Sequence, residues 1–95
     1  MINRVGNEID LIGKVDLENL SVYCDEIDSL LVLNDNVSIK MEALIPSGSS
    51  TLALIIHIKR KEKELNANVV FHDCPEKIYE MIRLSGLEEF ICFAL

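Results

Sequence analysis

The sequence predicts a single α/β domain in which helices pack against a small sheet. Apolar residues recur every second position in some segments and every three or four positions in others, and the two kinds of segment alternate along the chain. Turn-forming residues separate these segments. Its 95 residues, of which 49% are hydrophobic, are enough for one core. We therefore expect one domain over residues 1–95, with right-handed crossovers placing the helices on the sheet.

The first third of the chain predicts two strands and a helix. Residues 8–13 alternate roughly between apolar and polar, and an earlier strand is expected near residues 3–5. Asp16 can cap a following helix by accepting a hydrogen bond from an amide of its first turn. The helix is expected from Leu17 to about Leu31, because apolar residues occur there at helical spacing: Leu20, Tyr23, Cys24, Ile27, Leu30 and Leu31.

The middle of the chain predicts a strand, a helix and a second strand. Residues 37–43 alternate cleanly, which is typical of a half-buried strand, and Pro46 should end the pairing. A helix is expected from Ser50 to Leu65. A short buried strand is expected over residues 69–72.

The last quarter predicts a helix that starts at Pro75, where the missing amide costs no hydrogen bond. Gly86 stands where a left-handed residue would end that helix. The apolar tail over residues 87–95 is expected to form a last short strand or helix.

Charge and composition exclude several classes of function. The formal net charge of −7 opposes binding to nucleic acid or to anionic lipid. Three separated cysteines indicate neither a disulfide framework nor a zinc site. The chain opens with no signal-peptide pattern, and its apolar blocks are too short to span a bilayer. We expect a soluble cytoplasmic protein with free thiols, without a metal or cofactor and without direct membrane insertion.

The hydroxyl-rich stretch Ser47-Gly48-Ser49-Ser50-Thr51 does not fit a catalytic motif. It lacks the lysine and second glycine of a phosphate-binding loop and the second glycine of a nucleophile elbow. His57 lies about 12 Å along the helix from Ser49, which is too far to take its proton. We therefore expect no catalytic residue and predict that Ser49 or Ser50 caps the helix. Weak anion binding at the helix start stays open.

The apolar residues of the helix over 50–65 do not fit one buried stripe. Either the helix is buried on two sides, or it presents a strip around Ala53, Leu54 and His57 to a partner. We favour the partner.

Four segments resemble the STAS domain, the fold of anti-sigma factor antagonists. Gly13-Lys14-Val15-Asp16 resembles the G-x-(L/V)-D that precedes the first helix of that family. The closing run Leu84-Ser85-Gly86-Leu87-Glu88-Glu89-Phe90 resembles its L-x-x-(T/S)-G-L-x-x-(L/F) pattern and is the most specific of the four. The others are the hydroxyl stretch that opens the second helix, and the strand at 68–71 with the helix at 75–84. This resemblance implies a STAS-type sheet of about four strands with helices packed against it.

The resemblance implies a non-enzymatic protein and offers two partners. In Mla-type phospholipid ABC transporters a STAS subunit binds the cytoplasmic ATPase, with a hydroxyl residue that maps to Ser49. In anti-sigma factor antagonists a partner kinase phosphorylates a residue that maps to Ser50, or to its neighbour Ser49. Leu52-Ala53-Leu54-Ile55-Ile56-His57 is similar to the transporter branch, and Gly48 replaces the acid usual in the switch branch.

We therefore expect a transporter accessory subunit, recruited to the inner membrane by its complex. A phosphorylated anti-sigma factor antagonist that binds an anti-sigma kinase is the alternative, and a small-ligand sensor is a third class. The expected partner-binding residues lie in the hydroxyl stretch and on the second helix: Ser47, Ser49, Ser50, Thr51, Ala53, Leu54 and His57.

Overall fold

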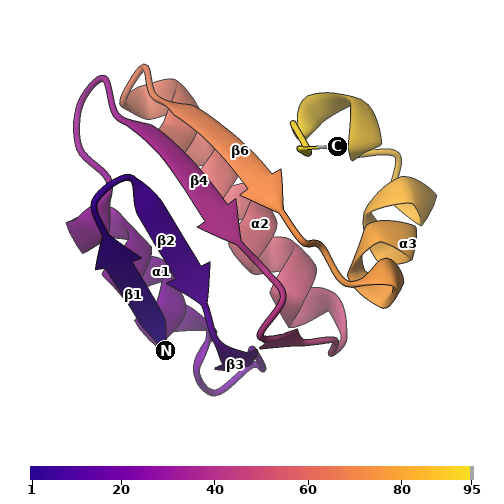
Figure 1. Ribbon diagram of the computed structural model, residues 1–95. Coiled ribbons are helices and arrows are strands. Elements are labelled where there is room, and N and C mark those ends of the chain that lie inside the picture. The colour runs from indigo at the N-terminus through magenta and orange to yellow at the C-terminus, as the bar shows by residue number, and fades with distance from the viewer. Residues whose placement is uncertain (95) are drawn as a thin grey trace.

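The computed structural model describes residues 1–94. Its elements in chain order are β1 (Ile2–Val5), β2 (Glu8–Leu11), β3 (Gly13–Lys14), α1 (Leu20–Leu30), β4 (Asn36–Lys40), β5 (Leu44–Ile45), α2 (Ser49–Glu64), β6 (Asn68–His72), α3 (Glu76–Leu84) and the short 3₁₀ helix η1 (Glu88–Phe90). Figure 1 shows α1 and α2 behind the main sheet and α3 beside β6.

The main sheet has four strands in the order β1-β2-β4-β6. β1 and β2 form an antiparallel hairpin, whereas β2, β4 and β6 run parallel. Parallel neighbours need a crossover, and α1 and α2 supply the two that connect β2 to β4 and β4 to β6. A second, two-stranded parallel sheet pairs β3 with β5 at the end of the main sheet. The α/β sheet of about four strands predicted from the sequence is thus confirmed.

The core lies between the sheet and the helices. Along β4, Val37 and Ile39 are buried while the alternate side chains remain at least partly exposed, and β6 repeats the pattern with Val69 and Phe71. This alternation is what a sheet with one covered face requires. The helices contribute the other half of the core, notably Tyr23, Ile27, Leu54, Ile55, Ile58, Ile78 and Ile82.

The strand predicted over residues 37–43 is shorter than expected. β4 ends at Lys40, because a turn follows in which the Leu44 amide donates to the Met41 carbonyl at 3.0 Å. Ala43 is exposed and does not continue the alternation, while Leu44 and Ile45 form the separate strand β5. The period-two pattern in the sequence therefore runs past the end of the pairing.

Helix α1 begins at Leu20, so the predicted start at Leu17 is wrong. The Asp16 carboxylate accepts hydrogen bonds from the Glu18 and Asn19 amides at 2.9 and 3.0 Å. Asp16 therefore organises a turn that precedes the helix instead of capping the helix itself. This turn leaves Leu17 with 86% of its surface exposed.

The tail forms a short helix, one of the two structures that the sequence left open, followed by an isolated β-bridge to Phe71. Gly86 has the expected left-handed backbone (φ +73°), and η1 follows it. The chain then runs along the outer edge of β6, where the Phe71 amide donates to the Cys92 carbonyl at 2.9 Å and the Ala94 amide donates to the Phe71 carbonyl at 2.8 Å. Leu95, the last residue of the predicted tail, lies outside the described residues.

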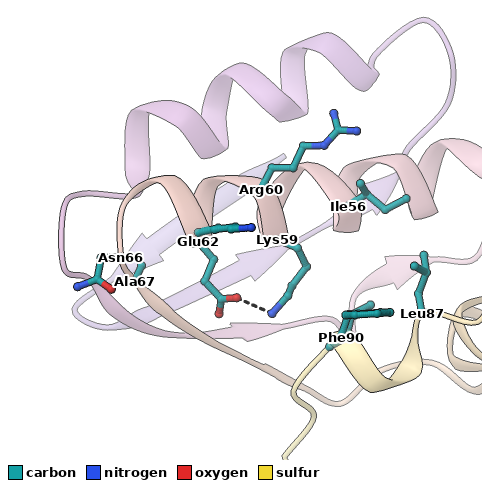
Figure 2. Close-up of a pocket in the computed structure, with 10 residues that line it drawn as sticks. Ile56, Lys59, Arg60, Glu62, Asn66, Ala67, Leu87 and Phe90 are labelled. Carbon is teal, nitrogen blue, oxygen red and sulfur yellow. Dashed lines mark hydrogen bonds and ion pairs between the residues drawn. The ribbon is translucent and has the colours of Figure 1, made fainter.

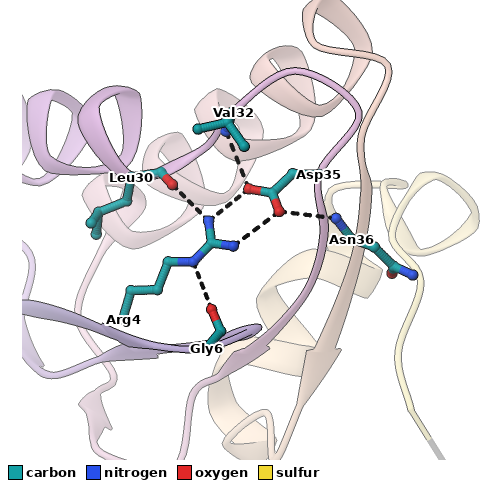
Figure 3. A network of polar contacts seen from close by, with 6 residues as sticks. All are labelled: Arg4, Gly6, Leu30, Val32, Asp35 and Asn36. Carbon is teal, nitrogen blue, oxygen red and sulfur yellow. Dashed lines mark hydrogen bonds and ion pairs between the residues drawn. The ribbon is translucent and has the colours of Figure 1, made fainter.

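A network centred on Arg4 joins β1 to the loop between α1 and β4 (Figure 3). The two terminal nitrogens of Arg4 donate to the two carboxylate oxygens of Asp35 at 2.6 and 3.0 Å. Arg4 also donates to the Leu30 carbonyl at 2.7 Å and to the Gly6 carbonyl at 2.9 Å. The guanidinium beside Asp35 lowers the pKa of this carboxyl, and the backbone amides of Val32 and Asn36 also donate to it.

Candidate functional site

The hydroxyl stretch of the sequence lies at the start of α2, beside the loop that leads to α1. A hollow of about 480 Å³ separates residues 14–18 from residues 47–50. The two loops meet because β3 pairs with β5, with Gly13 opposite Leu44 and Lys14 opposite Ile45. Gly13 has φ +99°, and a Cβ at this position would lie 3.0 Å from the Tyr23 hydroxyl. Glycine therefore permits the turn into this site.

Two of the predicted hydroxyls hold the loops together. The Ser47 hydroxyl donates to the Val15 carbonyl at 2.5 Å, and its oxygen lies 2.8 Å from the Thr51 hydroxyl. Because the proton of Ser47 is used by Val15, Thr51 must donate to Ser47. Thr51 is fully buried. These hydroxyls therefore fix the geometry of the site, and Thr51 cannot contact a partner without local opening.

Neither serine caps α2, so that prediction is wrong. The residue before the helix is Gly48, and no side chain caps the first turn. Ser49 is exposed, and its hydroxyl makes no hydrogen bond within the described residues. Ser50 is buried, with 7% of its surface exposed. Ser49 thus presents its side chain to solvent at the rim of the hollow, while Ser50 faces inward.

The expected exposed strip on α2 is not present. Leu54 is fully buried, and Ala53 is half-buried. His57 is also half-buried, and its Nε2 lies 2.7 Å from a carboxylate oxygen of Asp28 on α1. Helix α2 therefore packs on both the sheet and α1, which is the two-sided burial that the sequence left as the other explanation.

Two exposed apolar residues of the loops at this site were not singled out from the sequence. Leu17 lines the hollow, and Ile45, with 54% of its surface exposed, lies on β5 opposite Lys14. The exposure of Leu17 could have been predicted from the spacing of Asp16 and Asn19. This spacing allows Asp16 to accept the Asn19 amide in a turn, so the helix begins after Leu17. Leu17 is therefore a candidate for contact with a partner, because protein interfaces bury apolar side chains at their centre.

The described part of the chain has neither a metal-binding cluster nor a membrane-spanning helix. Within residues 1–94, no group of three or more His, Cys, Asp or Glu side chains is arranged to hold a metal ion. None of the helices in this part of the chain has the length and apolarity needed to cross a membrane.

Comparisons with known proteins identify the fold. No protein-family model matches the chain, and no curated protein matches it in sequence. Among solved structures, the proposed anti-sigma factor antagonist TM1081 of Thermotoga maritima matches with a TM-score of 0.73 and 16% identity, covering 98% of this chain and 83% of that one. The anti-sigma factor antagonist SpoIIAA in its unphosphorylated form matches with a TM-score of 0.73 and 16% identity, covering 100% of this chain and 87% of that one.

A chain of the Acinetobacter MlaFEDB complex in an ATP-bound conformation, the MlaB subunit, matches with a TM-score of 0.67 and 22% identity. The match covers 94% of this chain and 95% of that one. The order of the elements, the four-stranded mixed sheet and these similarities agree, and the chain has the STAS fold.

Proposed function

We propose that the chain is a non-enzymatic accessory subunit that binds the ATPase of a bacterial phospholipid ABC transporter. The observation that carries the proposal is the hollow at the start of α2, whose lining includes both the exposed Ser49 and the exposed Leu17. The similarity to MlaB over nearly the full length of both chains supports this class of partner. A cytoplasmic location at the inner membrane follows from such a complex.

The docking surface in this proposal differs from the one expected from the sequence. Ser49, Leu17 and Ile45 make the contact, with the half-buried Ala53 at its edge. Ser47, Ser50 and Thr51 support it from within, and Leu54 belongs to the core. His57 holds α2 to α1 through Asp28 and so fixes the angle at which the surface is presented.

The experiment measures binding of the purified chain to the ATPase encoded with a phospholipid permease in the same genome. Leu17→Asp and Ser49→Arg place a charge or a large side chain on the surface, and each should weaken binding at least tenfold. Leu33→Asp is the matched control, because Leu33 is also an exposed leucine but lies in the loop at the other end of β4. Equal binding by all three variants, or no binding by the unchanged chain, rejects the proposal.

The alternative is a switch that a kinase controls by serine phosphorylation, as the phosphorylated and unphosphorylated forms of SpoIIAA suggest. The exposure of Ser49 favours this residue over Ser50 as the acceptor, because a kinase needs access to the hydroxyl. A phosphate would add about two negative charges next to Leu17 and disrupt an apolar contact. Phosphopeptide mass spectrometry after incubation with the anti-sigma kinase of the same genome tests this alternative, and an unmodified Ser49 counts against it.

A further inference from the structure

A second concave surface lies on the other half of α2, away from the hydroxyl stretch. It is a groove of about 520 Å³ between the C-terminal half of α2 and the segment that contains η1 (Figure 2). Its volume falls within the range of small-molecule sites, which is about 300 to 1,000 Å³. Neither the sequence patterns nor the proposed docking surface accounts for it.

The lining of this groove is mainly apolar. Ile56 projects from α2, and Leu87, Phe90 and Ile91 come from the segment that follows α3. Phe90 leaves 67% of its surface in contact with solvent. Burial of apolar surface is favourable in proportion to its area, so an apolar ligand would be stabilised here.

Two cations at the groove lack partners. Lys59 is paired with Glu62, whose second oxygen accepts the Val69 amide at 2.7 Å, so this pair adds no net charge. The side chains of Arg60 and Lys63 make no ion pair or hydrogen bond with any residue from 1 to 94. They are three residues apart on one helix and therefore lie on the same side of it. The positive charge is confined to the α2 side of the groove, because Glu88 and Glu89 lie on η1.

Figure 2 shows how the two features are arranged. Leu87 and Phe90 lie on one side of α2, and the Arg60 side chain extends from the other side with its guanidinium directed away from them. Arg60 and Lys63 both contribute to the lining of the groove, so the polar end of a ligand in the groove would be within reach of these long side chains. A small polar anion would gain nothing from the apolar lining, and a neutral hydrocarbon would not use the cations.

We propose that this groove binds a single-chain anionic amphiphile of the fatty-acid class. The acyl chain lies on Ile56, Leu87 and Phe90, and the carboxylate is held by Arg60 and Lys63. Charge-assisted hydrogen bonds from a guanidinium to a carboxylate are stronger than neutral ones, and they fix the orientation of the ligand. The proposal is independent of the transporter or kinase partner, because it concerns a different surface.

The test is a titration of the isotope-labelled chain with octanoate, decanoate and dodecanoate below their micelle concentrations, followed by amide chemical shifts. We expect shifts centred on residues 56–67 and 87–91. The dissociation constant should fall about two- to fourfold with each added methylene until the groove is filled. Decanol, with the same chain and no charge, should bind at least threefold more weakly than decanoate.

Variants separate the two halves of the site. Arg60→Gln/Lys63→Gln should weaken decanoate binding and bring it to the level of decanol, and Phe90→Asp should weaken both ligands. Lys77→Gln, which removes an exposed lysine at the start of α3, is the matched control and should bind decanoate normally. Thermal unfolding of each variant establishes that it is folded.

Three results would overturn the proposal. Affinity that does not depend on chain length would mean that the apolar lining is not used. Binding that is unchanged in Arg60→Gln/Lys63→Gln would mean that the cations are not used. Binding only to vesicles of anionic phospholipid, with no shifts from monomeric decanoate, would assign the rim to a membrane surface instead of to a single amphiphile.

Discussion

Replacement of Arg4 by methionine should destabilise the protein strongly. The change keeps an unbranched side chain but removes four hydrogen bonds, two of which go to the Asp35 carboxylate. Removing one partner of a buried ion pair costs about 3–5 kcal/mol. Arg4 is 18% exposed and Asp35 keeps two amide donors, so we expect about 3 kcal/mol, the lower end of this range.

The thermal midpoint gives the readout. For a domain of this size each kcal/mol lowers the midpoint by about 4–8 °C, so circular dichroism should record a decrease of roughly 12–24 °C. The folded protein has only about 5–15 kcal/mol of stability in total, and the variant should still fold. Arg4→Met/Asp35→Leu, which removes both charges, should regain part of the loss, because no unpaired carboxylate remains.

The pH dependence supplies a second check. The folded-state pKa of Asp35 is lowered, chiefly by its hydrogen bonds from Arg4. Its contribution to stability is therefore present above the unfolded pKa of about 4 and is lost as the pH falls through the lower folded value. The difference between the unchanged chain and Arg4→Met should shrink below about pH 4. A difference under about 1 kcal/mol at pH 7, or one that is the same at pH 3, would refute this account of the network.

Three further predictions use the same measurements or simple labelling. Gly13→Ala should cost about 1–3 kcal/mol in urea denaturation, because its φ is +99° and its Cβ would meet the Tyr23 hydroxyl; an unchanged midpoint would contradict this. Leu54→Ala should lower the free energy of unfolding by about 2–5 kcal/mol, because Leu54 is fully buried. A decrease below about 0.5 kcal/mol would indicate instead that Leu54 is exposed on the helix surface. Maleimide at pH 7.5 should label the exposed Cys92 before Cys74, because burial raises the pKa of Cys74 to about 11 and keeps it as a thiol; mass spectrometry showing the reverse order would refute this.

Much of the fold could be predicted from the sequence, because in most elements the spacing of apolar residues matches the side chains that the structure buries. The strand at 68–72 and the helix at 49–64 were predicted within a residue or so. In both cases the apolar pattern ends where a turn residue follows, such as Asn66, whose left-handed φ of +51° closes the loop after α2. Periodicity is least informative at element ends, which is why α1 begins three residues later than predicted.

The candidate site was less predictable, because its exposure depends on packing. Adjacent residues on a helix point about 100° apart, so Ser49 can be exposed while its neighbour Ser50 is buried. Which of them is exposed is set by the position of α2 against the sheet and α1, and the sequence carries no local mark of that position. The same packing buries Leu54. The sequence-based prediction placed Leu54 on an exposed strip because it assumed that the helix is buried along one stripe only.

The hydrogen bonds at the two borders of the main sheet have a consequence for self-association. On the β6 side, the segment around Phe93 forms hydrogen bonds with the backbone amide and carbonyl of Phe71. A strand from another chain could therefore not pair with Phe71 at this edge. On the β1 side, the Ile2 amide donates to the Glu26 carboxylate at 3.1 Å. Unpaired strand borders are templates for aggregation, and side chains or terminal segments that occupy them prevent it. The chain thus engages part of both sheet edges itself, which disfavours edge-to-edge polymerisation at these positions.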